Sequence, residues 1–106
     1  MGRFVIVAYA PKPGKTEQLM AAVRKHMQVL RAEKLVTDRP AYVMRAKDGT
    51  IVEVFEWQSA DAIARAHTLP AVQALWGEFG EACEFKQLNG LAECQQMFAE
   101  FDAVAI

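Results

Sequence analysis

The sequence predicts a single α+β domain with an antiparallel sheet, and three observations lead to this prediction. Residues Arg3–Ala10 are mostly β-branched or aromatic, which is typical of a strand. Residues from Thr16 to about Lys34 carry apolar side chains at helical spacing. An Asp48-Gly49 pair then separates two runs in which the apolar period is two, and such a pair is a strong signal for a β-hairpin.

The first strand is expected to end at Pro11–Gly14, because proline and glycine interrupt a β ladder. In the helix that follows, four large apolar side chains fall on one arc at 100° per residue. They are Leu19, Val23, Met27 and Leu30. Charged and amide side chains occupy the opposite side, so the predicted helix is amphipathic and buries one face.

The hairpin is predicted to join strands Ala41–Lys47 and Thr50–Trp57 through a two-residue turn. That turn would pair Tyr42 with Phe55 and would fix which side chains share a face. One face would carry Tyr42, Met44, Ile51, Glu53, Phe55 and Trp57, and the other Val43, Arg45, Val52, Val54 and Glu56. Both faces are substantially apolar, so we expect one to pack on helices and the other on a second copy of the sheet. Which face meets the helices is open.

Ser59 is a suitable N-cap for a helix over Ala60–Thr68, and Pro70 interrupts that helix and suits the first turn of a further segment. We expect this segment to continue to Asn89-Gly90, and Gln95–Val104 to form the last strand. The predicted order is therefore β-α-β-β-α-β, the ferredoxin-like order, with a broken second helix, in one domain that spans residues 1–106.

The amino-acid composition argues against several classes of function. The net charge of −1 argues against a nucleic-acid surface, which needs clustered Lys and Arg. The longest apolar run is far short of the roughly 20 residues of a membrane span, and the N-terminus lacks a signal-peptide pattern, so we expect a cytoplasmic protein. Cys83 and Cys94 lack a metal-ligand spacing, and we expect no metal site and free thiols.

Three segments resemble the antibiotic biosynthesis monooxygenase (ABM) family of the dimeric α/β-barrel superfamily. They are Pro11–Lys15, Val54–Ala62, and His67 followed by Pro70–Val72. The resemblance implies a homodimer whose sheets face each other, with a ligand cavity in each subunit between sheet and helices. It also implies, for some members, oxidation of phenolic or quinol substrates by molecular oxygen without a metal, flavin or other cofactor.

The chain departs from the family in its polar residues. Cofactor-free oxygenases and haem degraders of this type commonly use an Asn with a Trp, or an Asn-Trp-His set. The only Asn here is Asn89, in a predicted turn, and His67 precedes Trp76 instead of following it. The sequence therefore does not predict haem degradation, and any oxygenase activity would rest on other side chains.

Three residues are candidates for proton transfer. His26 falls near the centre of the apolar arc, where it is either a base in a cavity or a core histidine bonded to a backbone carbonyl. His67 lies one turn after Ile63, and it either faces a cavity mouth or caps the last carbonyls of its helix. Glu53 falls among apolar neighbours, as a proton shuttle or as the partner of an Arg across a dimer interface.

Aromatic residues offer walls for a flat ligand, although ordinary core packing is the alternative for each of them. They are Trp57, Phe55, Trp76, Phe79 and Tyr42. Two functions follow as hypotheses. The first is a cofactor-independent monooxygenase acting on a small planar aromatic or quinol substrate. The second is a non-catalytic dimeric protein that binds a small hydrophobic molecule.

Overall fold

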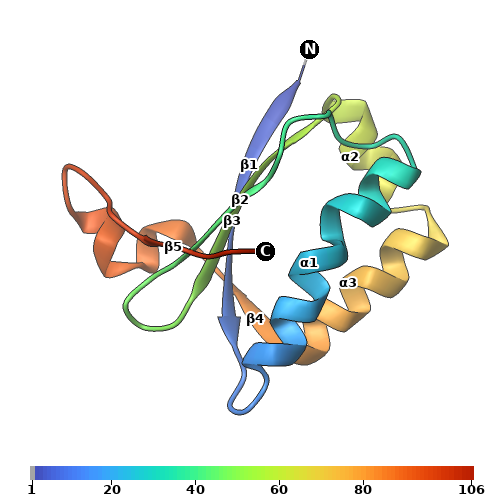
Figure 1. Ribbon diagram of the computed structural model, residues 1–106. Helices are drawn as coiled ribbons and strands as arrows, with labels where there is room; N and C mark the ends of the chain where they lie inside the picture. The colour runs from blue at the N-terminus through green and yellow to red at the C-terminus, as the bar shows by residue number, and fades with distance from the viewer. Residues whose placement is uncertain (1) are drawn as a thin grey trace.

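A computed structural model describes residues 2–106 and shows one antiparallel sheet with helices on one of its faces (Figure 1). The strands lie in the order β4-β1-β3-β2-β5. The strands are β1 (Arg3–Pro11), β2 (Tyr42–Arg45), β3 (Ile51–Trp57), β4 (Cys83–Lys86) and β5 (Asp102–Ala103). The helices are α1 (Thr16–Ala32), α2 (Ala60–Ala66) and α3 (Pro70–Ala82), followed by two 3₁₀ turns, Leu88–Gly90 and Ala92–Gln95. The α+β class is thereby confirmed, and the arrangement is compatible with a ferredoxin-like fold.

Helix α1 buries the predicted apolar arc against the sheet. Its buried residues are Leu19, Met20, Ala22, Val23, His26, Met27 and Leu30. The helix ends at Ala32, two residues before the expected Lys34, because Lys34 adopts a φ of 58° and its N–H bonds the Arg31 carbonyl. A left-handed residue of this kind turns the chain away from the helix axis. Leu35 follows and is fully buried.

The predicted hairpin register is wrong by one residue. Ala46 N–H donates to the Thr50 carbonyl at 2.8 Å, and this closes a three-residue loop in which Gly49 takes a φ of 93°. Asp48 completes the turn by accepting from Thr50 N–H at 2.9 Å, and this backbone hydrogen bond is the main reason that the pKa of Asp48 is lowered. A type I turn with a left-handed glycine uses three residues where the expected turn uses two.

The corrected register exchanges the faces of β2. Tyr42 pairs with Val54 and Val43 pairs with Glu53. Val43 therefore shares the helix-facing side with Glu53, whereas Tyr42 and its neighbour Met44 lie on the other side of the sheet. The expected shared face of Tyr42 and Glu53 is incorrect for this reason.

The broken second helix begins and breaks where predicted, although α2 ends at Ala66, two residues before the expected Thr68. The Ser59 hydroxyl accepts from Ala62 N–H at 3.1 Å and caps α2, and Pro70 begins α3. The end of α3 differs from the prediction, because the helix stops at Ala82 and Cys83–Lys86 pairs with β1 as β4. The expected last strand, Gln95–Val104, is also incorrect. Only Asp102–Ala103 within it pairs with β2.

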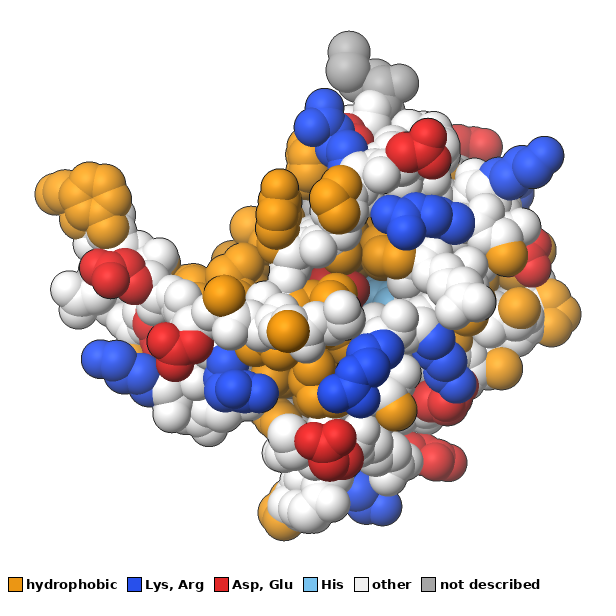
Figure 2. Space-filling view, viewed as in Figure 1, with side chains coloured by type: hydrophobic (Ala, Val, Ile, Leu, Met, Phe, Trp, Pro, Cys, Tyr) orange, Lys and Arg blue, Asp and Glu red, His pale blue; other side chains and the backbone are white. Residues whose placement is uncertain are grey.

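The sheet face opposite the helices is only partly covered. The segment after β4 packs Leu91 and its neighbours on Ala8, Ala46 and Val52. Beyond that cover, Ile6, Val54 and Tyr42 stand directly opposite one another on three adjacent strands. Figure 2 shows hydrophobic side chains along this side of the sheet, beside a hollow bounded by the C-terminal segment that Figure 1 draws in orange and red. We call this surface the open sheet face.

No helix within residues 2–106 has the length and apolar character that crossing a bilayer requires.

Candidate functional site

A cavity of about 290 Å³ lies between the sheet and helices α1 and α3. Its lining consists of Val5, Val7, Tyr9, His26, Phe55, Trp57, Trp76, Phe79 and Phe85. Alternation along β1 and β3 brings these strand residues to the helix-facing side, because every second side chain shares a face. Hydrocarbon and aromatic carbon dominate the lining, which suits a small, flat and largely apolar ligand.

Three polar side chains meet at one end of this lining. Tyr9 from β1 donates its hydroxyl to Glu53 Oε1 at 2.7 Å, and His26 Nδ1 from α1 lies 2.8 Å from the same oxygen. Glu53 on the central strand β3 is fully enclosed, and His26 is 3% exposed. We refer to Tyr9, Glu53 and His26 as the polar cluster. Its members come from three elements that are distant in sequence, so the complete fold is needed to assemble it.

The electrostatics of the polar cluster favour hydrogen bonding over ionisation of Tyr9. Burial is the main cause that raises the pKa of Tyr9 far above its usual range, and the neighbouring Glu53 charge raises it further. The Tyr9 hydroxyl therefore keeps its proton and acts as a donor. The second oxygen of Glu53, Oε2, has no partner within the described residues, although it is buried. Enclosing a polar atom without a partner is costly, which marks this cluster as more than ordinary packing.

Aromatic rings hold the His26 ring in place. It meets Phe55 edge-on at a centroid distance of 5.1 Å and Phe79 at 5.0 Å. Tyr9 stacks on the same Phe79 ring at 4.8 Å. These contacts orient the imidazole with Nδ1 toward Glu53 and leave its opposite edge for the cavity.

The structure brings most of the predicted site residues together. Phe55, Trp57, Trp76 and Phe79 line the cavity, and His26 and Glu53 lie in the polar cluster. Glu53 pairs with His26 and Tyr9 of its own chain, not with the Arg that was one of the two alternatives. Tyr42 lies apart from them, because the observed register of the hairpin places it on the open sheet face, where it is 66% exposed.

His67 lies outside the cavity. Its side chain is exposed, and its Nδ1 donates to the Ile63 carbonyl at 2.9 Å, which is the capping arrangement expected as the alternative. Its ring also meets Trp76 edge-on at 4.9 Å. Since Trp76 lines the cavity, His67 contacts the site through this indole ring only.

Sequence reasoning missed Tyr9, Val5, Val7 and Phe85. The alternation of β1 could have indicated the first three, because Val5, Val7 and Tyr9 share one side of an apolar strand. Phe85 lies in β4 and pairs with Tyr9 of β1, and the sequence pattern did not reveal this strand.

Cys83 lies beside the polar cluster, but its environment does not favour a chemical role for its thiol. Burial raises the pKa of its thiol to about 11, with Glu84 adding to the effect and Lys12 opposing it. A thiol of this kind stays protonated at neutral pH and is a poor nucleophile. Within residues 2–106, no three His, Cys, Asp or Glu side chains group together in a way that would hold a metal ion.

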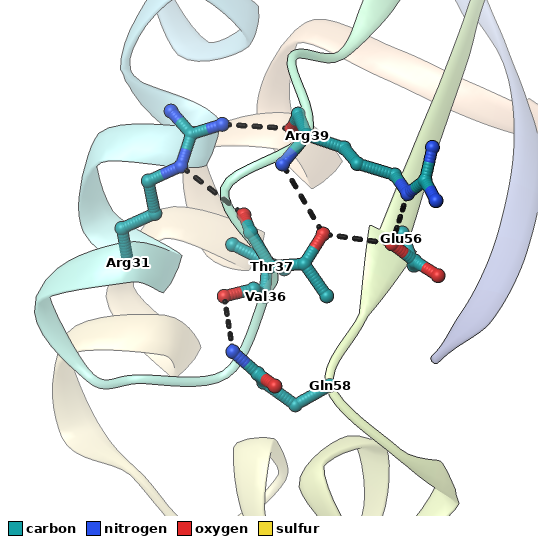
Figure 3. Close-up of polar contacts among 6 residues, drawn as sticks. All are labelled: Arg31, Val36, Thr37, Arg39, Glu56 and Gln58. Carbon is teal, nitrogen blue, oxygen red and sulfur yellow. Dashed lines mark hydrogen bonds and ion pairs between the residues drawn. The ribbon is translucent and has the colours of Figure 1, made fainter. Parts of the chain in front are cut away.

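A separate polar network fastens the segment between α1 and β2 (Figure 3). Glu56 Oε1 accepts from the Thr37 hydroxyl at 2.9 Å and pairs with Arg39 Nε at 2.8 Å, while Arg31 donates to the Arg39 carbonyl. The Arg39 guanidinium also lies 5.7 Å from the centre of the Phe4 ring. Because Arg39 is largely exposed, this pair adds little stability. The Glu56–Arg39 pair lies beside Phe4, at the edge of the open sheet face.

Comparison of the chain with protein-family models, curated proteins and solved structures finds no match.

Proposed function

We propose that this chain binds a small, flat, largely apolar molecule in the cavity, and that His26 accepts a proton from it. One observation carries the proposal: an apolar cavity of about 290 Å³ ends on a buried His–Glu–Tyr cluster. A buried polar cluster stabilises a fold less than an apolar core of the same volume would. Buried polar groups of this kind are concentrated at functional sites. The volume suits one or two fused rings.

The reaction that we propose for this site is a cofactor-independent oxygenation of a phenol, as the resemblance to the ABM family implies. His26 would take the phenolic proton, and the phenolate would react with molecular oxygen at a ring carbon. For 1-naphthol the balance is one naphthol and one O₂ to one naphthoquinone and one water. The ring carbon gains one oxygen atom, and the other leaves as water. A binding protein that performs no reaction is the second candidate, because the same apolar lining would serve it.

Binding is tested with 1-naphthol as the probe. We expect one naphthol per chain and a rise in Tm with naphthol concentration, because a ligand that binds only the folded state stabilises it. Val5→Phe adds bulk at the lining and should weaken binding at least tenfold, whereas Ile6→Phe adds bulk on the opposite side of β1 and should leave it unchanged. Equal binding by both variants in calorimetry would place the ligand elsewhere.

Catalysis is tested by oxygen uptake with 1-naphthol. Loss of a general base costs roughly 100-fold or more, so His26→Phe should reduce oxygen uptake by at least that factor. His67→Phe should reduce oxygen uptake far less, since His67 contacts the site only through Trp76. Uptake at the wild-type rate by the His26 variant would remove His26 from the mechanism. Naphthol binding without any uptake by the wild-type protein would favour the binding function.

We also propose that the protein is a homodimer joined through the open sheet face. Phe4, Ile6 and Tyr42 are 57%, 49% and 66% exposed there, and Ile6 and Tyr42 flank Val54 in one cross-strand row. Such a contiguous apolar patch on a sheet is typical of an interface. A standard interface buries roughly 800 Å² per partner. This is about an eighth of the 6613 Å² accessible surface of the chain.

The C-terminal segment supports the same proposal. Met97 and Phe98 are 93% and 78% exposed, on a segment that projects from the side of the sheet opposite the helices (Figures 1 and 2). A second copy in the hollow beside this segment would cover both side chains. The free thiols Cys83 and Cys94 agree with the reducing cytoplasm that we propose as the location.

A further inference from the structure

We infer that Glu53 and Tyr9 fix the His26 ring with its proton on Nδ1, so that Nε2 faces the cavity as a hydrogen-bond acceptor. The site would then select flat ligands that carry an O–H or N–H donor. This inference rests on the proposed function, because it names the chemistry of the ligand that the cavity takes.

The position of the proton follows from the partners of Glu53 Oε1. Tyr9 donates to this oxygen at 2.7 Å, and His26 Nδ1 lies 2.8 Å from it. Two contacts this short on one oxygen are typical of a carboxylate that accepts both. In the arrangement that we infer, Glu53 is an ionised carboxylate, which cannot donate, so the hydrogen in the second contact belongs to His26 Nδ1. Glu53 and Tyr9 are therefore positioning residues that set the tautomer.

The remaining ring nitrogen is open to the cavity. Within residues 2–106, Glu53 Oε2 is the one fully enclosed side-chain oxygen or nitrogen without a partner. His26 Nε2 also makes no hydrogen bond there, so it must keep some accessible surface. Since His26 is 3% exposed and lines the cavity, that surface belongs to the cavity.

The other polar atoms of the lining do not duplicate this role. The indole nitrogens of Trp57 and Trp76 are donors only. The Tyr9 hydroxyl already directs its proton to Glu53. In the neutral ring that we infer, His26 Nε2 is thus the one nitrogen among these nine lining residues that can accept a hydrogen bond. A ligand that brings a donor to it gains a hydrogen bond that a pure hydrocarbon of the same shape cannot make.

The tautomer is tested directly by ¹⁵N NMR of the ligand-free protein. We expect the His26 signals of a neutral ring with a protonated Nδ1 and a bare Nε2. A ring protonated at Nε2, alone or together with Nδ1, would overturn the inference. This measurement needs no ligand, so it is independent of whether the cavity binds 1-naphthol.

Selectivity is tested with naphthalene and 1-naphthol, which differ by one hydroxyl group. The wild-type protein should bind 1-naphthol more tightly than naphthalene. In His26→Phe this preference, measured as the ratio of the two dissociation constants, should fall about fivefold to tenfold, which is the contribution of one neutral hydrogen bond. Tyr9→Phe keeps the ring that stacks on Phe79 and should shift the ratio in the same direction, because Glu53 loses the donor that orients it.

The outcomes separate the two proposals. A ratio that is unchanged in both variants would overturn the inference and would leave the binding function standing. If neither compound binds the wild-type protein, the proposed function fails, while the NMR spectrum still tests the arrangement of the ring. Circular dichroism of each variant shows whether it is folded. Should His26→Phe fail to fold, Tyr9→Phe and the wild-type spectrum still test the inference.

Discussion

Glu53→Ala is expected to lower the free energy of unfolding by about 2–6 kcal/mol, because it leaves two buried donors without a partner at about 1–3 kcal/mol each. The Tyr9 hydroxyl and His26 Nδ1 both point at Glu53 Oε1 and would lose their partner in an enclosed space. The loss is a large part of the 5–15 kcal/mol that stabilises a typical domain. Urea denaturation followed by circular dichroism measures it.

The matched control is Glu53→Gln, which keeps the shape and one carbonyl oxygen as an acceptor. We expect it to cost less, about 1–2 kcal/mol, because both donors retain that acceptor. If Glu53→Ala lowered the free energy of unfolding by less than 1 kcal/mol, the polar cluster would not have the geometry described here.

Ile6→Glu should separate the proposed homodimer into single subunits. A central interface residue contributes roughly 2 kcal/mol, and a two-fold interface contains it twice. The dimer dissociation constant should therefore rise about a thousandfold. Ile6 is 49% exposed in the isolated chain, so the substitution has little effect on the fold itself. Sedimentation velocity at micromolar concentration gives the mass of the species present.

Gln28→Glu is the control for that experiment, because it adds the same charge on the solvent side of α1. It should leave the protein dimeric. A wild-type chain that sediments as a single subunit at these concentrations would reject the homodimer, and a dimeric Ile6→Glu variant would move the interface away from the open sheet face.

Much of the fold could be predicted because local rules determined it. The apolar arc of α1, the Ser59 cap and the break at Pro70 depend on residues within one or two turns, and the structure confirms all three. The hairpin was located for the same reason.

The register of the hairpin could not be predicted, because Asp48-Gly49 serves both a two-residue and a three-residue loop. The choice depends on which β2 side chains the rest of the core buries, and here it buries Val43 and exposes Tyr42. Strand β4 escaped prediction since Cys83 continues the apolar stripe of the preceding helix, and only pairing with β1 makes Cys83–Lys86 a strand.

The candidate site was predictable one residue at a time but not as an arrangement. His26 and Glu53 were unusual as polar side chains within apolar patterns, and both lie in the polar cluster. Their contact joins residues 27 positions apart, and no local pattern encodes it. Tyr9 was overlooked because a tyrosine in a strand is ordinary until a carboxylate lies beside its hydroxyl.

Methyl NMR during a titration with 1-naphthol tests most directly whether the cavity is the ligand site. Val5 and Val7 line the cavity on the helix-facing side of the sheet, whereas Ile6 and Val54 lie on the open sheet face. The predicted result is a saturable shift of the Val5 and Val7 methyl signals with Ile6 and Val54 unchanged. Shifts of Ile6 and Val54 alone, or no shift at all at high naphthol concentration, would contradict the account.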